Sequence, residues 1–153
     1  MADSIRNQIL DAVIAALGAI TAGATYNRTV NYVSEDLVHW EKLDKNKFDA
    51  AFPLDLSETD EQFALYSTAT NDIKATLEIM VTYYIWSGVA TTRQARGDAV
   101  RDVKKAILND STILGLVLNI RPMGTEPVVI TDHYSVLEIR FEADYLYDHT
   151  AGG

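Results

Sequence analysis

The chain has 153 residues, a length that fits one domain able to bury a sizeable core. With 48% hydrophobic and 23% charged residues, its composition is globular and excludes disorder or low complexity over most of its length. The sequence contains no cysteine, which excludes disulfides, thiolate nucleophiles and cysteine-ligated metal sites. The formal net charge of −9 argues against a nucleic-acid binder, because such proteins use cations to neutralise phosphates.

The first segment has the apolar spacing of an amphipathic helix. Asp3 or Ser4 can cap its start and Gly23 can end it. Although 22–24 resembles a signal-peptidase site, the residues before it are net negative, so we expect a retained helix and synthesis in the cytoplasm. Its apolar stripe is Ile5, Ile9, Val13, Ala16, Leu17 and Ile20.

Alternating apolar residues predict the next elements. A half-buried strand is expected over 26–33, followed by an irregular stretch that Trp40 anchors. A further strand surrounds Pro53, which suggests a strand start or a sheet edge. Residues 57–75 are acidic and then rich in Ser and Thr, so we expect an extended arm or loop there.

The strongest predicted strand covers 76–86, and a helix beginning at Thr91 or Thr92 should follow it to Leu108. On that helix Asp98 and Asp102 should be solvated members of a surface charge ladder. Three more strands are expected, at 117–120, 128–131 and 135–147, the first two separated by a turn at 122–124. The order α–β–β–β–α–β–β–β predicts one α+β domain over 1–147, with an antiparallel or mixed sheet, two helices on one face and a flexible tail at 148–153.

The search for catalytic motifs is negative, and we expect no cofactor and no metal. The histidines His39, His133 and His149 are expected in loops. An acidic cluster in the predicted arm, formed by Glu58, Asp60 and Glu61, favours a solvated loop over a cation site, which needs six or more oxygens. As an alternative of a different class, Asp132, His133 and Asp148 would serve a small metal-dependent hydrolase.

Four aromatic residues do not fit the predicted inward faces. Tyr84 and Trp86 fall on the second face of the strongest strand, and Tyr134 and Tyr147 lie near the ends of the last one. Tyr and Trp are enriched at protein interfaces. Either the second helix covers these side chains or they form a subunit interface.

Three segments resemble the tail terminator (tail-completion) proteins of tailed bacteriophages. Residues 101–117 read RDVKKAILNDSTILGLV, similar to a family helix that runs into D-x-T-L-G-G-L-V. The opening IRNQIL at 5–10 is similar to the family's first helix, and LEIRFEADY at 137–145 to its last strand. The matching structural positions are Asp102, Asp110, Thr112, Gly115 and Tyr145.

The resemblance implies a non-enzymatic virion protein that forms a hexameric ring on the head-proximal end of the tail tube. Such a ring stops tube polymerisation, binds the head connector and lets DNA pass without specific binding. Its partners would be copies of itself, the tube protein and the connector, and contact with a tail sheath protein is left open; no membrane is involved. Glu58, Asp60 and Glu61 would then lie in the lumen or between subunits. Another neck component, such as a head–tail connector, or a tube subunit is the nearest alternative.

Overall fold

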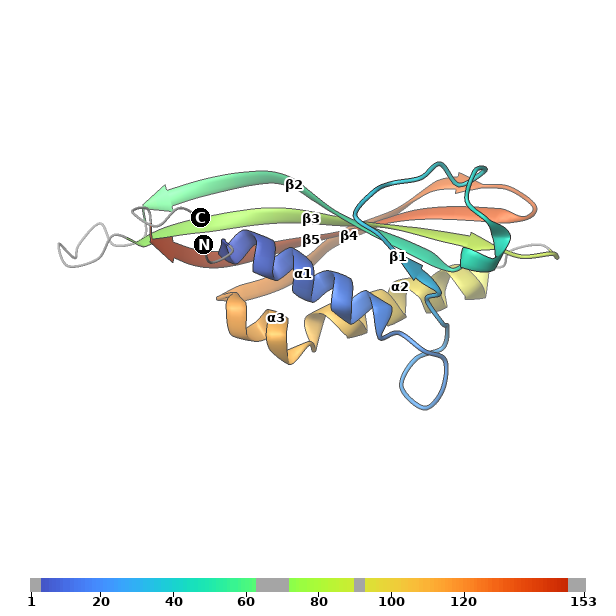
Figure 1. Ribbon diagram of the computed structural model, residues 1–153, viewed down its shortest axis with the longest axis horizontal. Helices are drawn as coiled ribbons and strands as arrows, with labels where there is room; N and C mark the ends of the chain where they lie inside the picture. Colours follow the sequence, from blue (N-terminus) through green and yellow to red (C-terminus); the bar gives the residue numbers. More distant parts are fainter. Residues whose placement is uncertain (1–3, 63–71, 90–92, 149–153) are drawn as a thin grey trace.

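The three described α-helices lie on one face of a single mixed sheet. The computed structural model describes residues 4–62, 72–89 and 93–148. Helices α1 (Ile5–Gly18), α2 (Arg93–Leu108) and α3 (Ser111–Leu116) lie on the same side of the sheet (Figure 1). The strands are β1 (Tyr32–Val33), β2 (Ala50–Gln62), β3 (Asp72–Trp86), β4 (Asn119–Ile130) and β5 (Tyr134–Asp148). The predicted α+β fold is confirmed, with α3 as an additional short helix.

The strands lie in the order β1-β2-β3-β5-β4. β1 pairs with β2 in parallel, and the other neighbouring pairs are antiparallel. The two central strands, β3 and β5, have 15 residues each, and they pair from Asp72 opposite Asp148 to Trp86 opposite Tyr134. At about 3.3 Å per residue these strands extend about 45 Å, so the sheet is long and narrow.

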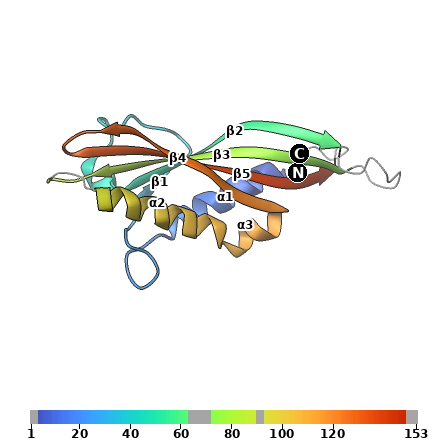
Figure 2. The ribbon, with the colours of Figure 1, turned by 180° about the vertical axis from the view of Figure 1, so that it is seen from behind.

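The main core lies between the sheet and the helices. Alternate residues of β3 and β5 point toward the helices, as period-two patterning requires. α1 lies near β2, whereas α2 and α3 lie near β4, as the opposite views in Figures 1 and 2 show. Fully buried members of this core include Ile9, Val13 and Leu17 of α1, Leu77, Ile79, Val81 and Tyr83 of β3, Val103 and Ile107 of α2, and Ile139, Phe141 and Tyr145 of β5.

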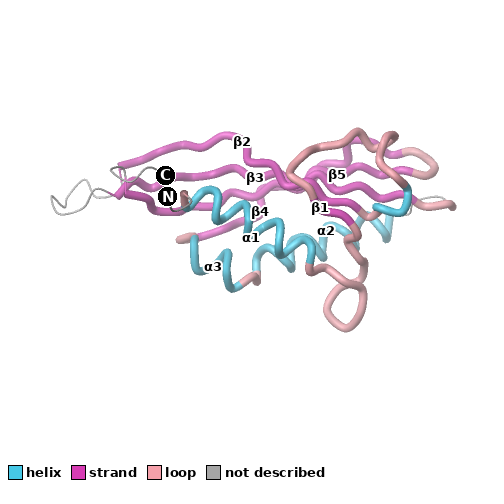
Figure 3. The backbone as a smooth tube through the Cα atoms, viewed as in Figure 1, coloured by secondary structure: helices cyan, strands magenta, loops and turns pink. Residues whose placement is uncertain are grey.

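A second, smaller core lies on the opposite face of the sheet. Residues 34–49, here named the covering segment, cross one end of that face and contain a short 3-10 helix, Lys45–Lys47 (Figure 3). Leu43 and Phe48 of this segment pack against Phe52, Tyr84 and Val136 of the sheet. The rest of this outer face carries ion pairs, including those of Arg121 with Glu142 and of Arg140 with Glu78.

The structure corrects two boundaries near the N-terminus. The Ser4 hydroxyl accepts a hydrogen bond from the Asn7 N–H, as predicted, but α1 ends at Gly18 and not at Gly23. The predicted strand over 26–33 is reduced to Tyr32–Val33. Its first half cannot join the sheet because the N–H groups of Asn27 and Arg28 donate to Asp102 of α2.

The predicted arm over 57–75 is wrong at both of its ends. Residues 57–62 belong to β2, and 72–75 belong to β3, with Thr59 opposite Thr76. The register shifts between Asp55 and Glu58, so a bulge interrupts β2 where the sequence suggested the end of the strand. The remaining arm residues, 63–71, lie outside the described residues, as does the tail beyond Asp148.

The two predicted strands at 117–120 and 128–131 are one strand, β4. The expected turn at 122–124 is a bulge in β4, and a second bulge follows at Pro127. Gly124 has a φ of 151°, a backbone conformation that residues other than glycine rarely adopt. Pro122 and Pro127 are tolerated because β4 is an edge strand, where a missing N–H costs no ladder hydrogen bond.

Candidate assembly surface

Tyr84 lies inside the second core and is 3% exposed. Its hydroxyl donates a hydrogen bond to the Val38 carbonyl over 2.7 Å. Trp86 and Tyr134 are half-buried at the margin of the same core, where the rings of Tyr134 and Trp40 lie 4.6 Å apart. The expectation that the second helix covers these aromatics is wrong, because the covering segment does so. Tyr84 is therefore not a surface residue of this chain.

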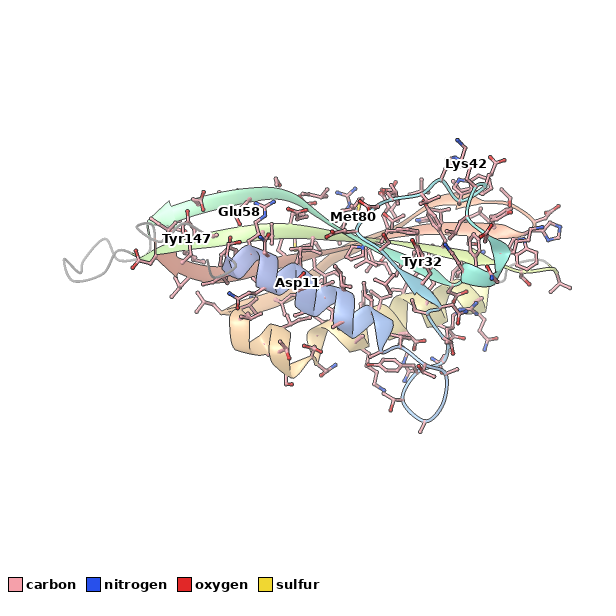
Figure 4. All side chains as sticks on the ribbon, viewed as in Figure 1. Asp11, Tyr32, Lys42, Glu58, Met80 and Tyr147 are labelled. Carbon is pink, nitrogen blue, oxygen red and sulfur yellow. The ribbon has the colours of Figure 1, made fainter. Side chains whose placement is uncertain are left out.

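Tyr147 and the three acidic residues of the predicted arm gather at the other end of the sheet (Figure 4). The Tyr147 hydroxyl donates to Asp60 over 3.1 Å, and the Tyr145 hydroxyl donates to Glu58. Burial and the Glu58 carboxylate raise the pKa of Tyr145 above its usual range. Glu61 is exposed. These acids thus lie along the β2 edge, the part of β2 beyond its short pairing with β1, and two of them accept hydrogen bonds from the tyrosines of β5.

Arg6 of α1 completes this end of the sheet. Its guanidinium pairs with Asp55 and lies 3.6 Å from Glu58, both on β2. Hydrogen bonding to Asp55 raises the pKa of Arg6. Arg6 of α1 therefore partly neutralises the acids of β2, whereas Glu61 is exposed and lies opposite Lys74 of β3.

Asp102 is 1% exposed, so the expectation of a solvated ladder is wrong for this residue. Its carboxylate accepts hydrogen bonds from the N–H groups of Asn27, at 3.0 Å and 3.1 Å, and of Arg28, at 2.7 Å. Its neighbour Lys105 donates to the Thr25 carbonyl. One turn of α2 thus holds the loop that leads from α1 to β1.

The other positions that carry the family resemblance are structural. Asp110 caps α3, because its carboxylate accepts a hydrogen bond from the Ile113 N–H over 2.9 Å. Thr112 and Gly115 are exposed on α3. Tyr145 is buried in the main core. The short helix α3 was not predicted, although the Asp-Ser-Thr start at 110–112 is an ordinary N-cap signal.

An ion pair between the half-buried Arg28 and the buried Asp49 links the covering segment to the main core. Arg28 contacts Asp49 with two nitrogen atoms, at 2.6 Å and 3.0 Å, and the Tyr83 hydroxyl donates to the same carboxylate over 2.7 Å. The hydrogen bond to Asp49 raises the pKa of Arg28, and burial followed by the Asp49 charge raises that of Tyr83. The partners satisfy one another, so this cluster is a structural anchor.

The residues of the hydrolase alternative do not come together. Asp132 and His133 lie in the turn before β5, and Asp148 is the last residue of that strand. A fully paired 15-residue strand separates them, which is about 45 Å. Among residues 4–62, 72–89 and 93–148 no group of three His, Asp or Glu side chains could hold a metal ion. His149 lies outside the described residues, and His39 and His133 are exposed.

The β4 edge carries large apolar side chains in contact with solvent. Leu118, Met123, Val128 and Ile130 are 52–55% exposed, and Leu114 of α3 is 49% exposed. Met123 and Val128 are the extra residues of the two β4 bulges. Together these five residues are named the β4 edge surface. Sequence patterning missed them because it divided β4 into two short strands around a turn.

Two hollows flank the sheet, one beside β4 and one beside β2. A groove of about 420 Å³ lies between α2 and β4, with Arg93, Arg96, Gly97, Val100, Lys104, Thr125, Pro127 and Leu137 as its lining. A notch of about 360 Å³ lies between α1 and β2, with Asn7, Leu10, Asp11, Glu35, Pro53, Leu54 and Asp55 as its lining. The groove is named the basic groove and the notch the acidic notch. They lie on opposite sides of the molecule, since β2 and β4 are on opposite sides of the central strands.

Comparison with known proteins assigns no family. No family model matches the chain, and no curated protein is significantly similar to it. In the part of the chain that the structure describes, no helix has the length and apolar character needed to cross a bilayer.

Proposed function

We propose that this chain is a virion structural protein, a tail terminator that forms a ring at the head-proximal end of a bacteriophage tail tube. The observation that carries the proposal is the β4 edge surface, five large apolar side chains exposed on and beside one edge strand. Large apolar side chains exposed along one edge strand favour an interaction site over a fully solvated edge. The resemblance of 5–10, 101–117 and 137–145 to tail terminators supplies the kind of assembly.

Ring closure is compatible with the unlike edges of the sheet. A closed ring of more than two copies uses a heterologous interface, in which one patch meets a different patch on the next copy. The β4 edge is apolar, whereas the β2 edge carries Asp55, Glu58, Asp60 and Glu61. Two unlike edges on opposite sides of one elongated subunit provide two such patches.

The charge of the chain suits a channel for DNA. Six copies carry a formal charge of −54, six times the −9 of one chain. Acidic walls repel the phosphate backbone, so DNA can slide without being held. Because the Debye length is about 8 Å at physiological ionic strength, only the acids that line the channel act on the DNA.

The test is the length of tail tubes assembled in the presence of the chain. Purified tube protein from the same virus is allowed to polymerise, and lengths are measured by negative-stain electron microscopy. We expect shorter tubes with an added ring at one end only. The Met123→Glu/Val128→Glu variant should lose this effect, whereas the exposed matched control Glu126→Gln should keep it.

Two other outcomes identify the neighbouring functions. Incorporation of the chain along the tube wall, with no limit on length, would make it a tube subunit. Binding to isolated head connectors with no effect on tubes would make it a connector component. Tubes that grow unchanged and carry no added ring would contradict the proposal of a terminator.

A further inference from the structure

The basic groove combines an apolar floor with uncompensated positive charge. Val100, Pro127 and Leu137 form the floor, and Arg93, Arg96 and Lys104 surround it. Among the described residues these three cations form no ion pair, in contrast to the arginines of the sheet. An apolar site with convergent cations is suited to an amphipathic partner that carries acids.

The position of two of these cations adds to the positive potential. Arg93 and Arg96 lie in the first turn of α2, which contains no acidic residue. The N-terminus of a helix already carries about half a positive charge from the aligned peptide dipoles. Inside this chain the two arginines are therefore placed unfavourably, and an acidic partner would relieve the repulsion.

The acidic notch is the counterpart on the opposite side of the molecule. Asp11 and Glu35 are exposed, and the described residues give neither of them an ion-pair partner. Figure 4 shows Asp11 on α1. The third acid, Asp55, is neutralised by Arg6. Leu10 and Leu54 are half-buried apolar members of the notch lining, and Pro53 of the lining is buried.

We propose that the basic groove of one copy binds the acidic notch of the next copy, with Arg93 and Arg96 paired to Asp11 and Glu35. This inference rests on the proposed ring and identifies its subunit interface. The long arginine side chains enter the notch, and the apolar residues of the two hollows exclude water around the pairs. The interface is heterologous, so each copy uses both of its sides.

Backbone pairing between edge strands is not available as the main contact. Pro122 and Pro127 lack N–H groups, and two bulges bend the same strand. Both features block the addition of a strand to a sheet edge. Neighbouring copies must therefore meet through side chains, which are concentrated in the basic groove and the β4 edge surface.

The experiment is a charge exchange between two variants, measured by sedimentation velocity over a concentration series at low salt. The Arg93→Glu/Arg96→Glu variant has two acidic sides, and the Asp11→Lys/Glu35→Lys variant has two basic sides. We expect wild-type chains to associate, and each variant alone to associate at least about tenfold more weakly. An equimolar mixture should restore the association, because each side then meets its opposite. Raising the salt to about 1 M, where the Debye length is about 3 Å, should weaken it again.

Control variants carry a single charge reversal of the same kind outside the two hollows. Arg101→Glu lies on the exposed side of α2, and Glu41→Lys lies on the covering segment. Both should associate like wild type. Circular dichroism of every variant checks that it is folded.

Three results would each contradict the proposed interface. The first is a wild type that stays monomeric at every concentration, and the second is a mixture that associates no better than its components. The third is a control variant that associates as weakly as the two test variants. A different result would assign the basic groove to nucleic acid. In that case the wild-type chain would bind duplex DNA, the Arg93→Glu/Arg96→Glu variant would not bind it, and the variant would still self-associate as strongly as wild type. The tube-length assay is separate, so an interface that fails while tubes are still capped leaves the terminator proposal standing. If the mixture restores association but the chain does not limit tube length, the proposal of a terminator is wrong and the proposed subunit interface stands.

Discussion

Tyr83 donates a hydrogen bond to the buried carboxylate of Asp49 over 2.7 Å. The two residues belong to different layers, since Tyr83 points from β3 into the main core and Asp49 ends the covering segment. Arg28 holds the same carboxylate from the loop that follows α1. The cluster therefore joins the two cores and the N-terminal loop at one point.

Removal of this carboxylate should destabilise the fold strongly. Asp49→Ala leaves the half-buried Arg28 without its partner and should lower the free energy of unfolding by about 3 kcal/mol. Tyr83→Phe removes one hydrogen bond and leaves the ion pair, so it should cost about 1 kcal/mol. Urea unfolding followed by circular dichroism measures both. Equal losses for the two variants would show that the ion pair contributes nothing beyond the Tyr83 hydrogen bond.

Asp102 should hold the loop between α1 and β1. Asp102→Ala removes the acceptor of two backbone N–H groups and should cost about 2 kcal/mol, because hydrogen bonds to a charged group contribute about 1.5–3 kcal/mol. The amide hydrogens of Asn27 and Arg28 should then exchange much faster, as seen by hydrogen-exchange mass spectrometry or NMR. Asp98→Ala, one turn earlier on α2 and half-exposed, is the control. Unchanged exchange at 27 and 28 would contradict the role of Asp102.

These two residues also show the limits of sequence patterning. Asp102 fits the polar side of an amphipathic helix, and its burial results from a loop 74–75 residues earlier in the chain. No local pattern records such a partner. Tyr84 is a similar case, because the residues that bury it belong to an irregular segment whose path follows from tertiary packing.

Elements with strong periodicity were predicted well. α1, α2, β3 and β5 follow from apolar spacing because one face of each is buried in the main core. β4 was divided wrongly, since Pro122 and Gly124 are signals for a turn as well as for a bulged edge strand. The β4 edge surface can be recognised only when 119–130 is seen as one bulged strand. For this reason sequence patterning did not indicate the candidate site.

Because Asp144 on the outer face of the sheet is ionised and paired, the free energy of unfolding should depend on pH in the acidic range. Burial alone would raise the pKa of Asp144, but hydrogen bonds from Thr76 and Arg121 outweigh burial and lower it. A carboxylate whose pKa is lower in the folded state stabilises the protein above its unfolded-state pKa. That stabilisation is lost as the pH falls through the folded-state value. It should therefore be complete at about pH 5 and begin to decline at about pH 4, the ordinary pKa of an aspartate, and it is lost only as the pH falls through the lower folded-state pKa.

Asp144→Asn tests this dependence. The variant should be less stable than wild type at about pH 6, and the difference should shrink as the pH falls below about 4 and the wild-type carboxylate becomes protonated. Urea midpoints across this range provide the measurement. Asp132→Asn, exposed in the turn before β5, should follow the wild-type curve. A difference between Asp144→Asn and wild type that stays constant with pH would exclude the ionised carboxylate as its cause.

The covering segment should depend on Trp40, whose ring lies 4.6 Å from that of Tyr134. Trp40→Ala removes a half-buried aromatic side chain and should cost about 2 kcal/mol, less than the 3–5 kcal/mol of a fully buried one. Detachment of the segment should expose Tyr84 and Trp86, with increased binding of a hydrophobic dye and a red shift of the remaining Trp86 fluorescence. His39→Ala is the matched control, because His39 stacks on the same indole ring but is exposed. It should change the stability by less than about 0.5 kcal/mol. If Trp40→Ala leaves dye binding and Trp86 fluorescence unchanged, Trp40 does not anchor the covering segment, and other contacts, such as those of Leu43 and Phe48, hold it in place.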